Sequence, residues 1–301
     1  MQSHNIYSRK RARYVVSIGG NALEYGKGKA ASLARAIESL YKRGDIVITH
    51  GNGPQVGKLA SEEQSASLAI LTAQTQAEIG IFMKGKLEEN LPSPPEIAIV
   101  ITSAVVNPGD PSFSNPTKPI GKFYGKKVAR AMSQHGYAMR KLIGGYRRVV
   151  PSPIPLSIPE LPLVKRLLDS HLLVIAGGGG GIPIVPIRRG IKFAEAVIDK
   201  DRTSSLIAEG IGAQMLLVLT NVDGAYLNYG KKGERLIGRA GVHEMNTYLR
   251  NGSFEEGSMK PKVEACVNFV EHTGKIAVIG NISRAEDVLA LRRCTIITEG
   301  P

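Results

Sequence analysis

The sequence predicts an α/β protein with a mostly parallel central sheet. Short runs of β-branched and aliphatic residues alternate with longer segments of helical pattern along most of the chain. This alternation is typical of parallel strands that are joined by helical crossovers. Glycine-rich turns directly follow two of the early runs, GGNA at 19–22 and HGNG at 50–53. Ligands of such sheets lie beyond the carboxyl ends of the strands, which is where both turns fall.

The first hundred residues contain three predicted strands and three predicted helices. Each strand is a short apolar run, and the first two runs end at the glycine turns. Pro54 suits the first turn of the helix that follows HGNG. The strands are expected at 14–18, 45–49 and 96–105, and the helices at 29–43, 55–67 and 72–91.

The alternation breaks at about Pro111 and stays irregular to residue 159. Pro and Gly become frequent there, and short strand-like pieces such as 146–150 replace the regular units. We interpret 111–159 as a subdomain inserted between two regular elements.

Regular elements return after the insert and continue to the end of the chain. A helix is expected to follow Asp199 and to run to residue 211. The other expected elements are helices at 161–170, 243–250 and 261–272 and strands at 172–176, 215–220, 275–279 and 295–298. We divide the chain into a basic tail (1–13), an N-terminal lobe (14–194) that carries the insert, and a C-terminal lobe (195–301).

The net charge of +13 comes from two segments only. Residues 1–13 hold four basic side chains and residues 111–159 hold nine, and neither segment contains an Asp or a Glu. Such a basic stripe is what a nucleic-acid binder would show. A basic lid that steers small anions into a cleft explains the same charges, and we favour it because the insert lacks a recognisable nucleic-acid motif. The tail is expected to be disordered.

Several classes of protein are excluded or disfavoured. The longest apolar run, 172–187, is too short for a membrane span and is broken by glycines and prolines, and the N-terminus has no apolar signal segment. Cys266 and Cys294 lack metal-ligand or redox spacing, so we expect two reduced thiols in a cytoplasmic protein. The chain has no P-loop and no Cys/His cluster, and a metal held by the protein alone is not expected.

The glycine turns suit an anion. GGNA follows a strand, so its amides can converge on a ligand, although a Gly-Gly turn can also be purely structural. In HGNGPQVG, Gly51, Asn52 and Gly53 leave backbone donors free at a helix N-terminus. We interpret His50 as a packed loop residue rather than a catalytic base. The later run Gly177–Gly181 allows close backbone approach by a ligand or forms a flexible turn.

Three lysines stand in contexts that suit phosphate. Lys200 lies between Asp199 and Asp201 at the start of a helix, where Asp199 either orients the lysines or only caps the helix. Lys262 follows Pro261 in a first helical turn, where a cation opposes the helix dipole unless an anion lies between them. Lys118 lies between two prolines in NPTKPIG, where the backbone is stiff. The alternative interpretation is that Lys118 is an ordinary surface lysine. Together with the glycine turns, these lysines indicate a site for a transferring phosphoryl group.

The ordered motifs resemble carbamate kinases of the amino acid kinase superfamily. Eight segments match in the family's order from about Val15 to Gly280: GGNALE, THGNGPQVG, DPSFSNPTKPIG, GYRRVVPSP, AGGGGGIPIV, AVIDKD, TNVDGAYLNYG and GSMKPKVEA. The resemblance implies a three-layer α/β/α sandwich with a small protruding subdomain, and a homodimer in arginine metabolism. It implies the reaction ATP + carbamate ⇌ ADP + carbamoyl phosphate, with Mg²⁺ carried in by the nucleotide.

The resemblance also implies a role for each motif residue. Lys118, Lys200 and Lys262 would be catalytic, with Asp199 arranging them. The carbamate or the transferred group would be held by Gly19, Gly20, Asn21, Gly51, Asn52 and Gly53. The nucleotide would be bound by Gly178, Gly179, Thr220, Asn221, Val222, Asp223, Tyr226 and Met259. Asn221 stands where the family more often has Asp.

Two alternative functions remain open from the sequence. One is another amino acid kinase that acts on a different small carboxylate or phosphate, and NPTKPIG argues against it. The other is a degenerate relative that binds nucleic acid through the basic insert, and the three intact lysines argue against it.

Overall fold

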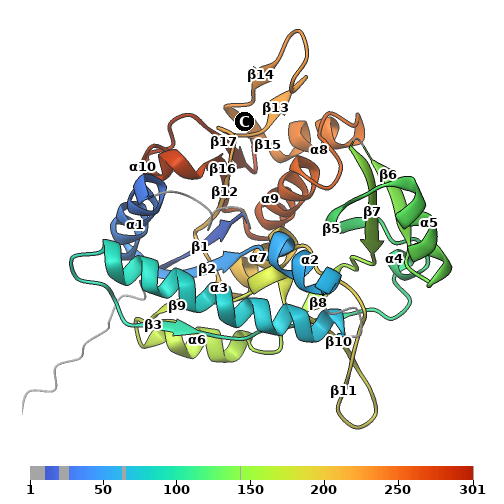
Figure 1. Ribbon diagram of the computed structural model, residues 1–301. Coiled ribbons are helices and arrows are strands. Elements are labelled where there is room, and N and C mark those ends of the chain that lie inside the picture. Colours follow the sequence, from blue (N-terminus) through green and yellow to red (C-terminus); the bar gives the residue numbers. More distant parts are fainter. Residues whose placement is uncertain (1–10, 20–26, 63–65, 143, 301) are drawn as a thin grey trace, which may run out of the picture.

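An eight-stranded sheet forms the centre of the protein (Figure 1). The computed structural model describes residues 11–19, 27–62, 66–142 and 144–300. All neighbouring strands of the sheet are parallel except β16 and β17. In spatial order the strands are β15 (Arg239–Gly241), β17 (Cys294–Thr298), β16 (Ile276–Asn281), β12 (Met215–Thr220), β1 (Ala12–Ile18), β2 (Gly44–His50), β9 (Leu173–Ile175) and β3 (Ile97–Ile99).

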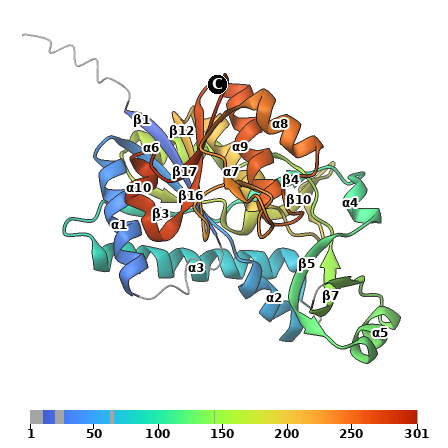
Figure 2. The same cartoon turned by 90° about the horizontal axis from the view of Figure 1, so that it is seen from above.

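Helices cover both faces of this sheet, as Figure 2 shows from above. One face packs against α1 (Lys27–Tyr41), α3 (Leu68–Asn90) and α10 (Ala285–Leu289). The other face packs against α6 (Leu161–Asp169), α7 (Lys200–Ile211), α8 (Val242–Arg250) and α9 (Met259–Thr273). The prediction of a mostly parallel α/β/α sandwich is confirmed.

The strands divide their side chains between two cores. In β12, Leu216 and Val218 belong to the core under α7 and α9, whereas Leu217 and Leu219 belong to the core under α1 and α3. Successive side chains of a strand point to opposite faces, and a strand buried on both faces is therefore apolar throughout. This is why the central strands are continuous apolar runs rather than alternating ones.

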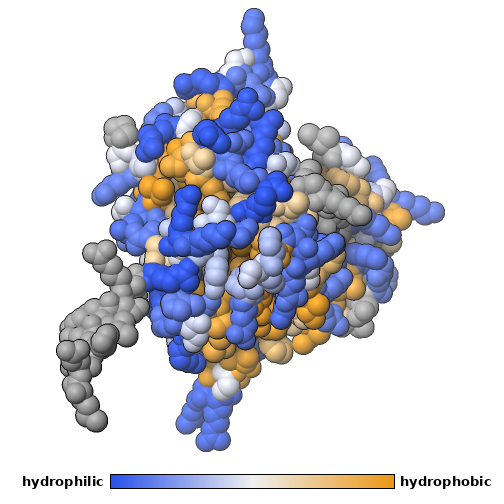
Figure 3. Space-filling model, turned by 90° about the vertical axis from the view of Figure 1, so that its left-hand side faces the viewer, coloured by the Kyte–Doolittle hydropathy of each residue, from blue (hydrophilic) through white to orange (hydrophobic). Residues whose placement is uncertain are grey.

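Smaller sheets surround the central one. A four-stranded sheet contains β11 (Ile191–Phe193), β10 (Ile182–Pro186), β4 (Ser103–Val106) and β8 (Pro155–Ser157). A two-stranded hairpin contains β13 (Tyr226–Leu227) and β14 (Arg235–Leu236). This hairpin and the β10–β11 hairpin project from opposite ends of the molecule (Figure 1), and both tips are hydrophilic (Figure 3).

The basic insert contains the three-stranded sheet β5 (Lys118–Tyr124), β7 (Gly145–Val150) and β6 (Met139–Leu142), together with α5 (Lys126–Gln134). It stands at one side of the molecule (Figure 2) and contacts the body through α2 (Gly53–Glu62). The remaining short helices are α4 (Pro111–Ser114), η2 (Gly178–Gly180) and η3 (Ile282–Arg284).

The expected single strand at 96–105 is wrong, because the chain forms β3 and β4 in two different sheets. Gln76 of α3 causes the interruption at Thr102. Its side chain donates to the Thr102 carbonyl and accepts from the Thr102 N–H, both at 3.0 Å. These two bonds hold both backbone groups of Thr102 at the point where the chain leaves one sheet for the other, and the Thr102 carbonyl also accepts from the Ile182 N–H at 2.9 Å.

The first strand begins earlier than predicted, inside the segment expected to be a disordered tail. β1 starts at Ala12, and the flanking arginines form ion pairs, Arg11 with Asp45 at 3.0 Å and Arg13 with Asp169 at 2.5 Å. Residues 1–10 of that tail lie outside the described residues. In the described ranges, no helix is long and apolar enough to cross a membrane.

Candidate active site

The candidate site lies where the carboxyl ends of the central strands meet. Ile18 at the end of β1 is in register with His50 of β2 and with Leu219 of β12, and Thr220 is in register with Asn281 of β16. The loops that follow β1, β2, β12 and β16 therefore begin side by side at one edge of the sheet. The N-terminus of α7 faces the same edge, because Ser17 of β1 contacts Asp201 in its first turn.

Asp201 is the centre of the charged cluster. Its carboxylate accepts from Lys200 Nζ at 2.5 Å and from Ser17 Oγ at 3.0 Å through one oxygen, and from Lys262 Nζ at 3.2 Å through the other. Lys200 also donates to Ser17 Oγ at 2.7 Å. The Asp201 side chain is almost fully buried. One carboxylate thus holds two ammonium groups from helices that lie about sixty residues apart in the sequence.

Asp199 brings the third lysine to the same place. It is the N-cap of α7 and accepts from the Asp201 N–H at 3.0 Å through one oxygen. Its second oxygen accepts from Lys118 Nζ at 2.7 Å. Lys118 is the first residue of β5, so the basic insert delivers this cation across the cleft. Three ammonium groups therefore surround two adjacent carboxylates, which leaves an excess of positive charge.

The charges of the cluster set the pKa values of its members. Burial by itself would raise the pKa of Asp201 and Asp199, but the lysine charges outweigh it and lower both. Burial lowers the pKa of Lys200, and the charge of Asp201 opposes that effect only in part. For Lys262, burial is outweighed by Asp201 and Asp199, so its pKa is raised. The two carboxylates are ionised at neutral pH, and each needs its ammonium partners.

The glycine turns are less open than the sequence suggests. The N–H of Gly51 donates to the carbonyl of Ile18 at 3.0 Å, and the N–H of Gly19 donates to the carbonyl of Leu219 at 3.2 Å. The expectation of free donors is therefore wrong for Gly51, because its turn continues the strand ladder. The free donors at this end of α2 begin with the N–H groups of its first turn, at Gly53. Gly20 and Asn21 lie outside the described residues.

Gly178 and Gly179, which the sequence predicted to bind the nucleotide, pack on the loop after β2. A Cβ added at Gly179 would lie 2.2 Å from the Asn52 amide, and one added at Gly178 would lie 2.6 Å from the His50 ring. The loop is fixed further by Asn52, which donates to Thr75 Oγ1 at 2.9 Å. Glycine is required at these two positions for close packing.

His50 is buried under this glycine run. Burial lowers the pKa of His50 to about 4, and its Nδ1 faces the carbonyl of Gly51 at 3.3 Å. The ring is neutral at pH 7, and among the described residues no carboxylate is paired with it to activate it as a base. This environment is that of a packed loop residue.

Most of the other residues predicted for the nucleotide lie at the end of β12 and in the loop that follows it. Thr220 ends β12, and Asp223 accepts from Asn281 Nδ2 and from Arg284, both at 3.1 Å. Asn281 also donates to the carbonyl of Asn221 at 3.4 Å. Val222 follows in the same loop, Tyr226 begins β13, and Met259 begins α9 and packs against the core.

A cleft of about 960 Å³ lies between the basic insert and the first turn of α9. Lys118 and Asp199 open into it, and Arg140 and Lys141 of β6 line it from the insert. The cleft is large enough for a nucleotide-sized ligand.

The sequence argument missed Asp201 and Ser17 as site residues. Asp201 lies inside AVIDKD, so its motif was found but its role was given to Asp199 alone. Ser17 is a fully buried hydroxyl in the apolar strand β1, and a polar residue in such a strand is the signal that could have found it.

Comparison with known proteins gives this cluster a context. Residues 12–281 match the sequence profile of the amino acid kinase family. A carbamate kinase of Thermoplasma acidophilum is 39% identical, with 95% of this chain and 99% of the relative covered. A carbamate kinase of Halobacterium salinarum is 41% identical, with 91% and 94% covered. A structure of the Giardia lamblia carbamate kinase bound to AMP-PNP superposes with a TM-score of 0.84 at 35% identity, over 96% of this chain and 98% of that one.

Proposed function

The chain belongs to the carbamate kinases of the amino acid kinase family, and we propose that it transfers a phosphoryl group reversibly between ATP and carbamate. The products of the forward reaction are ADP and carbamoyl phosphate. The observation that carries the proposal is the gathering of Lys118, Lys200 and Lys262 around Asp199 and Asp201 at the carboxyl edge of the sheet. A site that transfers a phosphoryl group, with negative charge spread over its three oxygens, between two anions needs such an excess of positive charge.

The lysines act by offsetting charge. In the proposed reaction, Lys200 and Lys262 face the oxygens of the transferring phosphoryl group, and Asp201 holds both ammonium groups in place before the substrates arrive. Preorganised charges lower the barrier because they do not have to reorient as charge develops. Lys118 enters from the insert, lines the cleft, and reaches the cluster through Asp199, which accepts from its Nζ at 2.7 Å.

The transfer is direct and in line. His50 is neutral and Cys266 is buried, so neither side chain offers an activated nucleophile beside the cluster. The carbamate oxygen is itself the nucleophile, and the enzyme supplies alignment of two anions and neutralisation of their repulsion. The first turn of α2 directly follows the loop after β2, and we expect its free N–H groups to hold the carbamate.

Mg²⁺ belongs to the proposal as an ion that the nucleotide carries. Among the described residues, no group of three His, Cys, Asp or Glu side chains could hold a metal ion. All four carboxylate oxygens of Asp199 and Asp201 already accept hydrogen bonds. Such a site fits an ion held chiefly by phosphate oxygens and water. When bound, the ion would neutralise part of the phosphate charge.

The proposal includes a cytoplasmic homodimer. Large exposed apolar side chains lie on β8 and β11 of the four-stranded sheet and on α3: Leu156, Ile191, Phe193, Ile81 and Phe82. Exposed apolar side chains of this kind suit an interface with a second copy of the chain. Both cysteines are free and buried, which is compatible with a reducing compartment.

The direct test is ATP formation from ADP and carbamoyl phosphate, measured with a coupled assay. We expect turnover by the parent protein and a fall of at least ~10²-fold in Lys262→Ala, the usual effect of losing one charge-stabilising donor. Lys275→Ala serves as the matched control, because Lys275 is an exposed lysine just after the other end of α9. Absence of ATP formation by the parent, or parent-like turnover in Lys262→Ala, contradicts the proposal.

A further inference from the structure

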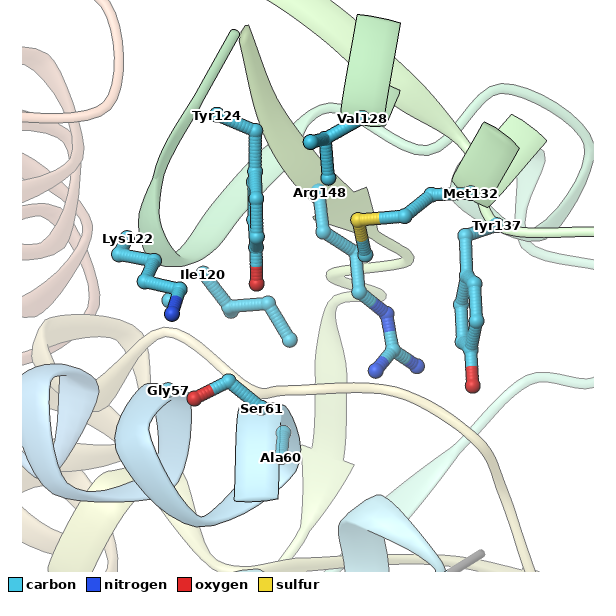
Figure 4. A pocket seen from close by; sticks show the side chains of 11 residues that line it. Gly57, Ala60, Ser61, Ile120, Lys122, Tyr124, Val128, Met132, Tyr137 and Arg148 are labelled. Carbon is cyan, nitrogen blue, oxygen red and sulfur yellow. The ribbon is translucent and has the colours of Figure 1, made fainter. Parts of the chain in front are cut away.

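A second cavity lies on the other side of the contact between the insert and the body. This seam pocket has a volume of about 200 Å³ and is walled by α2, β5, α5 and β7. Figure 4 shows its side chains: Tyr124 and Tyr137 stand on either side, Met132 and Val128 close one end, and Arg148 lies between the two rings. The seam pocket shares no lining residue with the large cleft.

A tight backbone contact holds the seam together. A Cβ added at Gly57 of α2 would lie 2.4 Å from the backbone nitrogen of Gly121 in β5. Gly121 has a φ of +69°, a conformation that L side chains rarely adopt. The two backbones therefore meet at van der Waals distance beside the pocket. Ser61 and Ala60 of α2 form its floor.

The pocket combines apolar walls with two cations. The Arg148 guanidinium lies over the Tyr137 ring at 4.5 Å, and Lys122 Nζ lies 5.7 Å from the centre of the Tyr124 ring. The insert has no Asp or Glu, and within the part of the chain that the structure describes neither cation forms an ion pair. A guanidinium stacked on an aromatic ring is held in a fixed orientation with its donors exposed at the edge.

We propose that the seam pocket is a binding site for a small organic monoanion with a carboxylate head and a body about the size of one six-membered ring. An enclosed space of about 150 Å³ holds a benzene molecule, so the observed volume fits a ring with one substituent. The Arg148 fork matches a carboxylate through two parallel hydrogen bonds. Tyr124, Met132 and Val128 contact the ring, and Lys122 adds charge at the rim.

Occupation of the seam pocket links two elements that carry site residues. α2 begins at Gly53 in the loop after β2, and β5 carries Lys118 at its first position. A ligand that bridges Ser61 and Arg148 restrains the insert on the body. A small carboxylate bound in the seam pocket therefore acts on the elements of the catalytic cleft without entering the cleft.

Benzoate is the probe, and its binding to the intact protein is followed by isothermal titration. We expect saturable binding with one benzoate per chain and a Kd on the order of 1 mM or below, the range for a ligand of this size. Benzamide has the same shape without the charge, and we expect it to bind at least ~10-fold more weakly. Equal affinities for the two compounds, or no binding of benzoate up to about 10 mM, overturn the proposal.

Two variants test whether benzoate binds in the seam pocket. Arg148→Gln is expected to weaken benzoate at least ~10-fold, because it removes the charged fork, while Arg130→Gln on the exposed side of α5 leaves the affinity unchanged. A circular dichroism melt shows that each variant is folded. Parent-like affinity in Arg148→Gln, or an equal loss in Arg130→Gln, places benzoate elsewhere and overturns the assignment.

A final arm separates the seam pocket from the cleft and rests on the proposed function. Saturating carbamoyl phosphate is not expected to displace benzoate, because the two cavities share no lining residue. Displacement of benzoate would make the pocket an extension of the substrate cleft and would refute a separate site. Failure of carbamoyl phosphate to support ATP formation bears on the proposed function alone, since benzoate binding is measured directly.

Discussion

Replacement of Asp201 by Asn removes the one charge that holds two of the lysines that we propose to be catalytic. Asp201 is almost fully buried and contacts Lys200, Lys262 and Ser17. Asn has the same size, but its amide nitrogen cannot accept a hydrogen bond, so at least one ammonium group loses its partner. The change therefore tests both the stability of the cluster and its catalytic role.

The magnitude follows from the partners that remain. Breaking a buried ion pair by removing one member costs about 3–5 kcal/mol. Lys200 keeps Ser17 Oγ at 2.7 Å and Lys262 keeps the Ser258 carbonyl at 3.2 Å, so we expect the lower end, about 3 kcal/mol. Turnover should fall by at least ~10²-fold. Urea unfolding with linear extrapolation and the ATP-formation assay measure the two effects.

The pH dependence gives a third readout with a defined sign. The folded-state pKa of Asp201 lies below its ordinary value of 3.8, so its contribution to stability is present above pH 3.8 and is lost as pH falls through the folded-state pKa. The stability difference between parent and variant should therefore be constant near neutral pH and shrink below about pH 4. Burial lowers the pKa of Lys200 and the charge of Asp201 opposes that effect, so the loss of this charge lowers the pKa further and the variant should lose activity at a lower pH on the basic side.

Asp287→Asn is the matched control, because Asp287 pairs with Arg292 at 2.8 Å on the surface. An exposed pair contributes at most about 1 kcal/mol. The view that Asp201 holds the lysines in place is refuted if the free energy of unfolding of Asp201→Asn lies within about 1 kcal/mol of that of this control and its turnover is parent-like.

Three further outcomes are expected. Gly179→Ala should destabilise the protein by ~2 kcal/mol or more in urea unfolding, because φ is +58° and the new Cβ meets Asn52 at 2.2 Å. Gly190 is also at positive φ but has open space around it, so Gly190→Ala should destabilise the protein less. Equal losses of stability in the two variants would contradict the packing argument. Light scattering should show a particle of two chains, and Phe193→Asp should shift it toward one chain; a monomeric parent would rule out the dimer. Burial raises the pKa of the Cys266 thiol, so a thiol reagent should react with Cys266 only after unfolding, and rapid labelling of the folded protein would show that it is accessible.

The local pattern of the sequence was sufficient for the main features of the fold. Short apolar runs that alternate with helical segments predicted the mostly parallel sheet, and the glycine turns after two of these runs predicted a site at its carboxyl edge. Lys118, Lys200 and Lys262 could be named because each lies in a local context that is costly or stiff, such as a cation in a first helical turn. The family resemblance assigned the reaction, which composition and spacing left open.

Only the tertiary structure decided which groups meet. Asp201 rather than Asp199 binds both Lys200 and Lys262, and the two lysines come together because α7 and α9 pack on one face of the sheet. Gln76 interrupts the strand at Thr102 from another helix, and the Gly51 N–H is used by β1. A sequence pattern reports the local preference of each residue, whereas a hydrogen bond or an ion pair depends on the distance between atoms from distant segments. That distance exists only after the layers of the sandwich have packed.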